Sequence, residues 1–435
     1  MAHVEPLAPV RIGGTDIHFA QGIKAGDWLF FTGHEAIDFE TGLAATVAGP
    51  AGLPNHGLPR HRREGNFILN RLSGLLKKAG SDLPHGVRLD QYYPDYRAVD
   101  GYHLARKATF GAYIPPSTSV LMSELSARGA EINTSLLAVM PGGGRDPQRV
   151  SADGVPVPPT SGFAVSVISG DFVFVAGQMA QDDANRHLDP RATRASPRAV
   201  WSGTEIRQQT EFLITHRLKP AMEAAGSSLA NAVKAQIYLG DIADTAHCLD
   251  VWNSHFGKSP CAVSVVPTAG FGFTDGIIEI NLMGIRDKGA TKKEVIDTKL
   301  PAGMAYGPAA VRAGDLVCLS GLVAAGESGP IGGIGAADGL HHYGAGARRQ
   351  MQAILETATT ICKAAGTSLE NVTRAHHFLT DLGELYPALR GWEPHLPGAA
   401  LPFGAVRVPS PMPVPGATIM ADLWAYAPTR RSRRK

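Results

Sequence analysis

The chain has 435 residues, of which 44% are hydrophobic and 18% are charged, so it can build packed cores and is not a disordered chain. Its 41 Lys and Arg residues nearly cancel 39 Asp and Glu residues. The net charge of +2 excludes a general attraction to nucleic acid or to anionic membranes. Four cysteines without C-x-x-C spacing indicate neither a zinc site nor a disulfide scaffold. With no leader pattern and no apolar run long enough to span a bilayer, we expect a cytoplasmic protein.

The sequence repeats itself three times. A Gly-Asp pair stands between apolar stretches at Gly26, Gly170 and Gly314, which are two equal steps of 144 residues apart (from 26 to 170 and from 170 to 314). A second landmark, "KKAGSDL", "EAAGSSL" and "KAAGTSL", follows each pair in the same order. Two landmarks that recur in order indicate a triplicated unit. We predict repeats at 1–147, 148–290 and 291–435.

Each repeat predicts the same elements in chain order. Two short strands flank the Gly-Asp turn, as in "FAVSVI" and "FVFVAG" over 163–177, and a variable loop follows. A helix comes next; in the third repeat its apolar face is Met351, Ile354, Leu355, Ala358 and Ile361. A strand, a second helix and two final strands complete the unit, as in 231–241, 245–257 and the segment ending at "NLMGIRD". The prediction is an α+β fold of three β-β-α-β-α-β-β repeats.

At this point the sequence resembles the Rid family, the YjgF-like reactive-intermediate deaminases, in three tandem copies. The segments that carry the resemblance are "GDFVFVAGQ" over 170–178, "EAAGSSL" over 223–229, "VKAQIYLGD" over 233–241, Pro260, and "IIEI" ending at Ile280. The resemblance implies a chorismate-mutase-like fold that assembles as a trimer, with a central β-barrel, outer helices and clefts between subunits. Three copies on one chain would form a single-chain pseudo-trimer with three different clefts.

Family members of the deaminase type carry an arginine just after the proline of the penultimate strand, and it holds the substrate carboxylate. The matching positions here are Thr118, Ala262 and Gly404. The sequence departs from the family at all three copies. We therefore do not expect efficient deamination of simple amino-acid-derived imines.

The family's glutamate on the last strand, which positions a water molecule, matches Glu279 in the second repeat. Glu131 is a possible equivalent in the first repeat, with an alignment uncertain by two residues, and Met420 takes the place in the third. Glu279 is therefore a candidate for proton transfer. The working cleft is expected to be lined by the first repeat, and the sequence leaves open whether Glu279 shares that cleft or lies in an adjacent one.

The position after the landmark glycine is Gln178 in the second repeat and His34 in the first. His34 is followed by Glu35, a pair that could act as base and orienting group. Adjacent residues on a strand face opposite sides, however. A hydrogen-bonded surface imidazole is the alternative for His34.

The first repeat holds a dense polar and aromatic segment over 92–106. It lies where the resemblance places a strand end and the second helix, beside a cleft. Its alternative interpretation is an exposed, salt-bridged helix start. Together with the hydroxyls after Pro116, this segment completes the candidate set: catalytic Glu279, Tyr93, His103 and His34, and substrate-binding Arg97, Arg106, Thr118, Ser119 and Gln178.

The adjacent histidines His376 and His377 do not indicate a metal, because consecutive strand residues cannot bind one ion from the same face. We expect no cofactor. The leading hypothesis is a hydrolase, deaminase-like or proton-transfer enzyme acting on a small aromatic or enamine-type metabolite in an inter-repeat cleft. The alternatives are a non-catalytic pseudo-trimer that binds a small ligand, and a structural scaffold. The chain is expected to be a monomer or a homo-dimer of pseudo-trimers.

Overall fold

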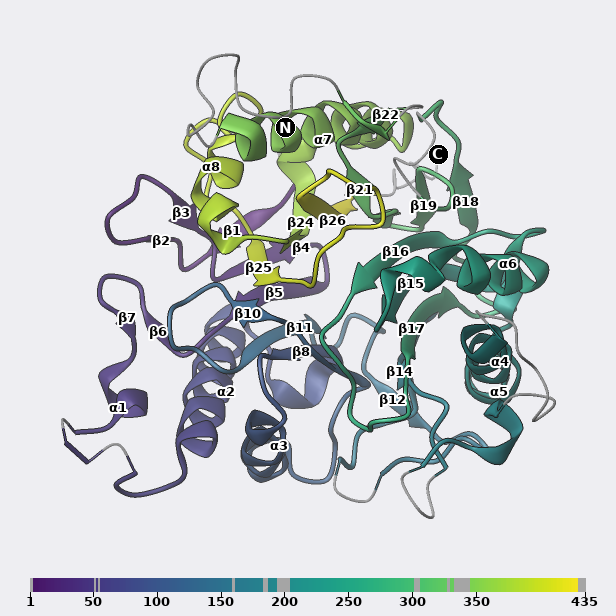
Figure 1. The fold of residues 1–435 in the computed structure, drawn as a ribbon, viewed down its shortest axis with the longest axis horizontal. Helices are drawn as coiled ribbons and strands as arrows, with labels where there is room; N and C mark the ends of the chain where they lie inside the picture. Colours follow the sequence, from purple (N-terminus) through teal and green to yellow (C-terminus); the bar gives the residue numbers. More distant parts are fainter. Residues whose placement is uncertain are drawn as a thin grey trace.

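Each third of the chain folds into a sheet with helices on one face, and the strand order is the same in all three sheets of the described residues (Figure 1). The computed structural model describes residues 3–428 except 51, 54, 159–160, 183–186, 194–203, 301–305, 327–328 and 332–344. We call the three parts the first unit (β1 to β11), the second unit (β12 to β17) and the third unit (β18 to β26).

The first sheet has the order β1-β4-β5-β11-β8-β9, with strands Glu5–Leu7, Gly22–Ala25, Trp28–His34, Asn133–Val139, Gly86–Tyr93 and Ser117–Leu121. The second has the order β12-β13-β14-β17-β15-β16, with strands Gln148–Val150, Ser166–Ser169, Phe172–Gln178, Ile278–Ile285, Ala232–Leu239 and Ala262–Pro267. The third contains β18-β19-β20-β26-β24-β25, with strands Lys293–Ile296, Ala310–Ala313, Leu316–Leu319, Ile419–Tyr426, Val372–Leu379 and Phe403–Arg407. In each of these orders the last two strands are parallel to each other, and the other neighbouring strands pair antiparallel.

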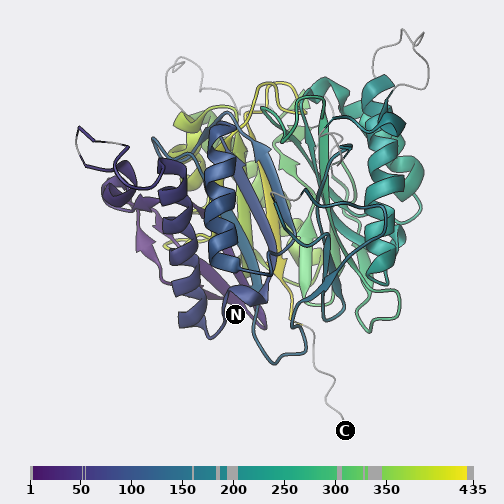
Figure 2. The same cartoon turned by 90° about the horizontal axis from the view of Figure 1, so that it is seen from below.

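The longer helices lie on the outside of the molecule and the sheets face its centre (Figures 1 and 2). They are α2 (Arg60–Ala79) and α3 (Arg97–Phe110) in the first unit, α4 (Thr204–Leu213), α5 (Lys219–Ala224) and α6 (Thr245–Phe256) in the second, and α7 (Ala345–Ala364) and α8 (Leu385–Arg390) in the third. A π-helical turn over Ile214–Leu218 joins α4 to α5 just before Pro220. No helix among the described residues is long and apolar enough to cross a membrane.

Smaller elements complete the described part of the chain. They are helix α1 (Ala45–Ala48), the strand pairs β2 (Val10–Arg11) with β3 (His18–Phe19), β6 (Ile37–Asp38) with β7 (Gly42–Leu43), and β22 (Ala325–Gly326) with β23 (Gly329–Pro330), and the strands β10 (Glu124–Leu125) and β21 (Leu322–Val323). Single 3-10 turns occur at Leu83–His85, Pro190–Ala192, Leu229–Asn231, Ile242–Asp244, Leu369–Asn371 and Leu382–Glu384. Most of these elements lie in the loops that separate a sheet from its helices.

The sequence landmarks have a conformational cause. Gly26, Gly170 and Gly314 have φ values of +56°, +59° and +57°, in the left-handed region that only glycine enters without strain. The second landmark glycines end the first helix of each unit in the same region, with φ values of +86°, +69° and +76° at positions 80, 226 and 366. The apolar face predicted for α7 is fully buried.

One element differs from the prediction. Each unit begins with an additional edge strand, β1, β12 or β18, that pairs antiparallel with the next long strand. Each unit is therefore β-β-β-α-β-α-β-β. These three short strands are only three or four residues long, and their side chains are mostly exposed, so no alternating apolar pattern marks them in the sequence.

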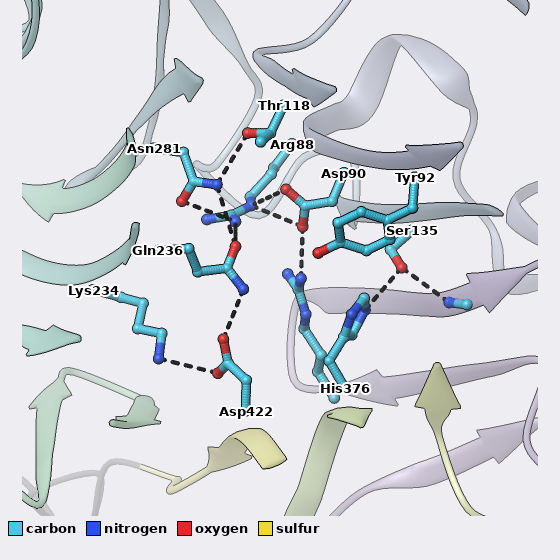
Figure 3. A network of polar contacts seen from close by, with 12 residues as sticks. Arg88, Asp90, Tyr92, Thr118, Ser135, Lys234, Gln236, Asn281, His376 and Asp422 are labelled. Carbon is cyan, nitrogen blue, oxygen red and sulfur yellow. Dashed lines mark hydrogen bonds and ion pairs between the residues drawn. The ribbon is translucent and has the colours of Figure 1, made fainter. Parts of the chain in front are cut away.

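The inward faces of the three sheets pack against one another. One apolar cluster combines Trp28, Phe172 and Trp424 with their neighbours, and a second combines Tyr92, Tyr238 and Phe378. Polar side chains from all three units form a buried network between these clusters (Figure 3). The network includes Arg88, Asp90, Ser135, Lys234, Gln236, Asn281, Arg374, His376 and Asp422.

Main-chain hydrogen bonds join the units at their edges. Leu121 at the end of β9 donates to the Gly270 carbonyl of the second unit at 3.0 Å. Gly321 of the third unit donates to the Val263 carbonyl of the second at 3.0 Å. Strand β10 of the first unit pairs with β25 of the third. The last strand of each sheet, β9, β16 or β25, thus contacts the next unit.

Candidate functional site

A cavity of about 300 Å³ opens where β9 and α3 of the first unit meet β14 and β17 of the second. Its lining brings together five of the nine residues that the sequence nominated: Tyr93, His103, Ser119, Gln178 and Glu279. Tyr93, His103 and Ser119 come from the first unit, whereas Gln178 and Glu279 come from the second. We call this cavity the first cleft.

Glu279 is the buried acid of the first cleft. It lies on β17 opposite Tyr238 and is 2% exposed. The Ser119 backbone N–H, from the other unit, donates a hydrogen bond to its carboxyl group, but Oε2 has no hydrogen-bond partner. Burial raises the pKa of Glu279 to about 8, because desolvation penalises the charged form more than one hydrogen bond stabilises it. At neutral pH the side chain is therefore mostly protonated.

Gly177 explains why a glycine precedes Gln178. The pairing of β14 with β17 shifts between Val175 and Gln178, so the strand bulges at this point. A Cβ atom at Gly177 would overlap Oε1 of Glu279 and lie 3.1 Å from Oγ1 of Thr118. The missing side chain gives the carboxyl group its space in the cleft.

The first unit supplies the hydroxyl-bearing wall. Tyr93 ends β8, and its hydroxyl donates to Gln91 Oε1 at 3.4 Å. Burial raises the pKa of Tyr93 well above its ordinary value, so the phenol stays neutral and can donate a hydrogen bond. The Ser119 hydroxyl also donates to Gln91 Oε1, at 3.3 Å. His103 joins this wall from α3.

Thr118 does not line the first cleft. Its side chain points to the interior, where its hydroxyl accepts a hydrogen bond from Asn281 Nδ2 at 3.0 Å (Figure 3). Ser117 and Ser119 line the cleft instead, because alternate residues of a strand face the same side. Of the two nominated hydroxyls, Ser119 is in the lining, whereas Thr118 is one residue away from both lining serines and faces the opposite side of the strand. No arginine stands at either serine.

The two predicted substrate-binding arginines also lie elsewhere. Arg106 is fully buried behind the cleft wall and donates to Gln91 Oε1 at 2.8 Å and to Ser117 Oγ at 3.0 Å. It therefore positions lining residues and does not face the cavity. Arg97 is on the surface, where it pairs with Asp95 at 3.0 Å. For Arg97 the alternative interpretation, an exposed salt-bridged helix start, describes what the structure shows.

His34 lies outside the first cleft. It is buried, and its Nε2 is 2.7 Å from the Gln21 carbonyl oxygen. Burial lowers its pKa to about 4, so it is a neutral imidazole. Its neighbour Glu35 faces the other way and lines a different cavity. The opposite-face argument thus describes this pair correctly.

Strand register settles which residues correspond to Glu279. Glu279 is opposite Tyr238, Asn133 is opposite Tyr92, and Met420 is opposite Phe378 at the same place in each sheet. The first-unit equivalent is therefore Asn133 and not Glu131, which lies two residues earlier. Glu131 contacts His61 and Arg60 near the surface.

Sequence reasoning missed several lining residues. They are Ser117, Phe163, Arg217 and Phe271, whereas Tyr96 and Asp100 also line the cavity. Arg217 is engaged by the carbonyl oxygens of Gly154 and Gln181 at 2.6 and 2.9 Å. Tyr96 and Asp100 belong to the tyrosine-rich segment that did signal the site. Nothing in the local pattern distinguishes Arg217 from other helical arginines, because the unit boundary that it faces is set by tertiary packing.

The histidine pair of the third unit faces two sides of β24. His376 is 3.0 Å from Ser135 Oγ in the central network (Figure 3). His377, on the other face, accepts a hydrogen bond from Trp392 Nε1 at 3.2 Å. Among the described residues, no three His, Cys, Asp or Glu side chains are grouped so that they could hold a metal ion.

Comparisons with known proteins find relatives for part of the chain. The sequence model of the family described as Endoribonuclease L-PSP matches residues 156–285. A RutC family protein of Pyrococcus abyssi is 32% identical over 108 residues, which are 25% of this chain and 74% of the relative. A RutC family protein of Pyrococcus horikoshii is 31% identical over 108 residues, 25% of this chain and 75% of the relative.

Solved structures align with about a third of the chain. A putative endoribonuclease from Thermotoga maritima is 24% identical, with a TM-score of 0.27, and covers 32% of this chain and 98% of its own. Yeast Mmf1 is 20% identical, with a TM-score of 0.27, and covers 32% of this chain and 99% of its own. On the strength of the Pyrococcus relatives, the chain belongs to the RutC family, which is the Rid family named above.

Proposed function

We propose that the chain is a single-chain pseudo-trimer of three Rid-type copies, with boundaries near 147 and 290 and a central barrel made by the inward faces of the three sheets. The common strand order and the shared interior support this proposal. Matched positions of the three sheets carry Arg88, Lys234 and Arg374, then Asp90, Gln236 and His376, then Ser135, Asn281 and Asp422. Because these triplets differ and bond to one another, each copy has a fixed place in the assembly.

We propose further that the first cleft is the working site of a metal-independent hydrolase of the deaminase type. The observation that carries this proposal is Glu279: a buried carboxyl group with a free oxygen, in a cavity between two copies. An acid whose pKa lies near 8 can give and take a proton close to neutral pH. The substrate class is a small neutral molecule with a C=N bond or an enamine.

The residues suggest a proton path for such a substrate. The Glu279 carboxyl group donates its proton to the imine nitrogen, which makes the carbon electrophilic. The resulting carboxylate then takes a proton from a water molecule, while the oxygen of that water molecule bonds to the electrophilic carbon. The reprotonated Glu279 then gives this proton to the nitrogen, the C–N bond breaks, and the hydroxyl group returns its proton to Glu279 as the C=O bond forms, which releases the amine and a carbonyl product. The Tyr93 phenol and the Ser119 hydroxyl orient a polar group of the substrate.

The lining of the first cleft also supports the expectation that imines with a carboxylate beside the reacting carbon are poor substrates. The positions flanking Thr118 carry serines, so no guanidinium projects from β9 to pair with a carboxylate. Arg217, at the opposite wall, is held by carbonyl oxygens and lies 3.8 Å from Asp189. We therefore propose that simple amino-acid-derived imines, which carry a carboxylate beside the reacting carbon, are poor substrates.

The test is incubation of the purified protein with a metabolite extract, followed by mass spectrometry. Metabolites consumed by the wild type and not by Glu279→Gln are substrate candidates. Tyr93→Phe and His103→Ala should each lower kcat for them by about 10² or more if these groups take part in proton transfer. Glu131→Gln is the matched control, because it makes the same change at a carboxylate outside the cleft.

Three outcomes would decide between the hypotheses. Loss of turnover in Glu131→Gln with full activity in Glu279→Gln would refute the assigned site. Ligand retention without any turnover would favour the non-catalytic pseudo-trimer. Rapid hydrolysis of amino-acid-derived imines, generated by a coupled oxidase, would contradict the substrate class.

A further inference from the structure

A second cavity, of about 520 Å³, lies at the junction between the third and first units. We call it the second cleft. Its walls come from α8 and β25 of the third unit and from segments 12–19, 33–43 and 126–128 of the first. The second cleft lies at the same position in the third–first junction as the first cleft in the first–second junction, but its lining residues are chemically different.

The second cleft has an aromatic wall. The Phe19 ring lies 5.6 Å from the ring of Phe39 and 5.3 Å from that of Phe403, measured between centroids. All three residues line the cavity. By strand register Phe403 corresponds to Ser117 of the first cleft, and Ala405 corresponds to Ser119. Hydroxyls in one cleft are thus replaced by apolar groups in the other.

Glu35 is the buried acid of this lining, and burial raises its pKa, because desolvation penalises the charged form more than its four hydrogen-bond donors stabilise it. Its Oε1 accepts hydrogen bonds from Asn133 Nδ2 at 2.7 Å and from the Ser126 hydroxyl and backbone N–H at 2.8 and 3.2 Å. Its Oε2 accepts a hydrogen bond from the Ala127 N–H at 2.7 Å, the one contact of this oxygen among the described residues. A carboxylate oxygen has two acceptor positions, so Oε2 has capacity for one further donor.

The acidic groups that line the mouth of the second cleft outnumber the basic ones. Glu35, Asp38 and Glu40 line the cavity, and Arg128 is the one Lys or Arg residue in the lining. The N–H groups of Glu40 and Thr41 donate to Asp38 and lower its pKa, so this carboxylate is charged at neutral pH. The lining therefore carries an excess of negative charge, which attracts cations.

The nearby cation Arg71 lies outside the lining, although its charge contributes to lowering the pKa of Asp38. Its guanidinium donates to the Glu35 and Ile37 carbonyl oxygens and lies over the rings of Phe39 and Phe67, 5.0 and 4.6 Å from their centroids. It is held on the helix side of the 35–39 segment and is not part of the lining.

We propose that the second cleft is a binding site for a small aromatic or branched aliphatic primary amine, with the ammonium group at Glu35 and the apolar body against Phe19, Phe39 and Phe403. An ammonium group supplies the donor that Glu35 Oε2 lacks, and a charge-assisted bond of this kind is about twice as strong as a neutral one. The aromatic faces favour the same cation. This site does not depend on catalysis in the first cleft.

The test is isothermal titration calorimetry at pH 7 with three probes of matched size: 2-phenylethylamine, 2-phenylethanol and phenylacetate. The amine should bind at one site per chain and at least about tenfold more tightly than the alcohol or the acid. Equal or tighter binding of phenylacetate would overturn the proposal.

Three variants locate the site. Glu35→Gln should bring the amine and the alcohol within about threefold of each other. Because Glu35 also holds the 126–127 turn, the double variant Asp38→Asn with Glu40→Gln at the exposed mouth is a second test, and it should weaken the amine by about threefold. Ala127→Phe places a ring in the cavity while its N–H to Glu35 is kept, and it should abolish binding. Amine binding that survives Ala127→Phe would place the ligand elsewhere and overturn the assignment.

Discussion

The clearest prediction concerns the effect of Glu279 on stability as pH changes. Its pKa is about 8 in the folded chain, against an ordinary value of 4.5. Between these two values the unfolded chain loses the proton while the folded chain retains it, so stability must fall as pH rises. The loss begins near pH 4.5 and is complete above pH 8.

The magnitude follows from the two pKa values. Each pH unit in this window costs about 1.36 kcal/mol, which gives about 3 kcal/mol at pH 7 and about 5 kcal/mol above pH 8. Glu279→Gln removes the titrating group and keeps an oxygen that can accept from the Ser119 N–H. The variant should therefore match the wild type near pH 4.5 and exceed it in stability at pH 8.5.

The assay is guanidinium unfolding followed by tryptophan fluorescence at pH values from 4.5 to 9. The quantity compared is the difference in unfolding free energy between the wild type and the variant at each pH. Glu131→Gln is the control, since it leaves Glu279 in place and should retain the wild-type slope. If the curves of the wild type and Glu279→Gln run parallel, the carboxyl group is not held protonated by the cleft.

Three further predictions use simpler measurements. Gly177→Ala should lower the unfolding free energy by about 1–3 kcal/mol, because its Cβ would overlap the Glu279 carboxyl group. Gly74→Ala on α2, whose Cβ meets nothing within 4 Å, should raise the unfolding free energy by up to about 1 kcal/mol, and thermal melts compare the two variants. Asp90→Asn should cost about 3–5 kcal/mol, because two buried arginines lose their shared carboxylate, and an unchanged denaturation midpoint would argue against that network. Light scattering should give the mass of one 45.9 kDa chain or of two, and three separated lobes in solution scattering would contradict the pseudo-trimer.

The amino-acid sequence by itself determined the local conformations. Left-handed turns need glycine, and so Gly26, Gly170 and Gly314 appear as a visible landmark at equal spacing. The apolar face of α7 follows the helical period, and each strand that the pattern marked is present. The resemblance and the tyrosine-rich segment also led to Glu279, Gln178, Tyr93, His103 and Ser119, which line one cavity, although the sequence did not decide whether Glu279 shares a cleft with the first-unit residues.

The tertiary structure decided which side chains face that cavity. A one-residue difference along β9 puts Thr118 in the interior and its neighbours in the cleft, because successive strand residues face opposite sides. Arg106 follows the helical pattern of a surface residue, yet packing of α3 against the sheet buries it behind the wall. The pKa of Glu279 also depends on packing, since the carboxyl group loses water only when β9 of another unit covers it. Periodicity fixes each element separately, but which two elements adjoin depends on contacts between residues more than a hundred positions apart.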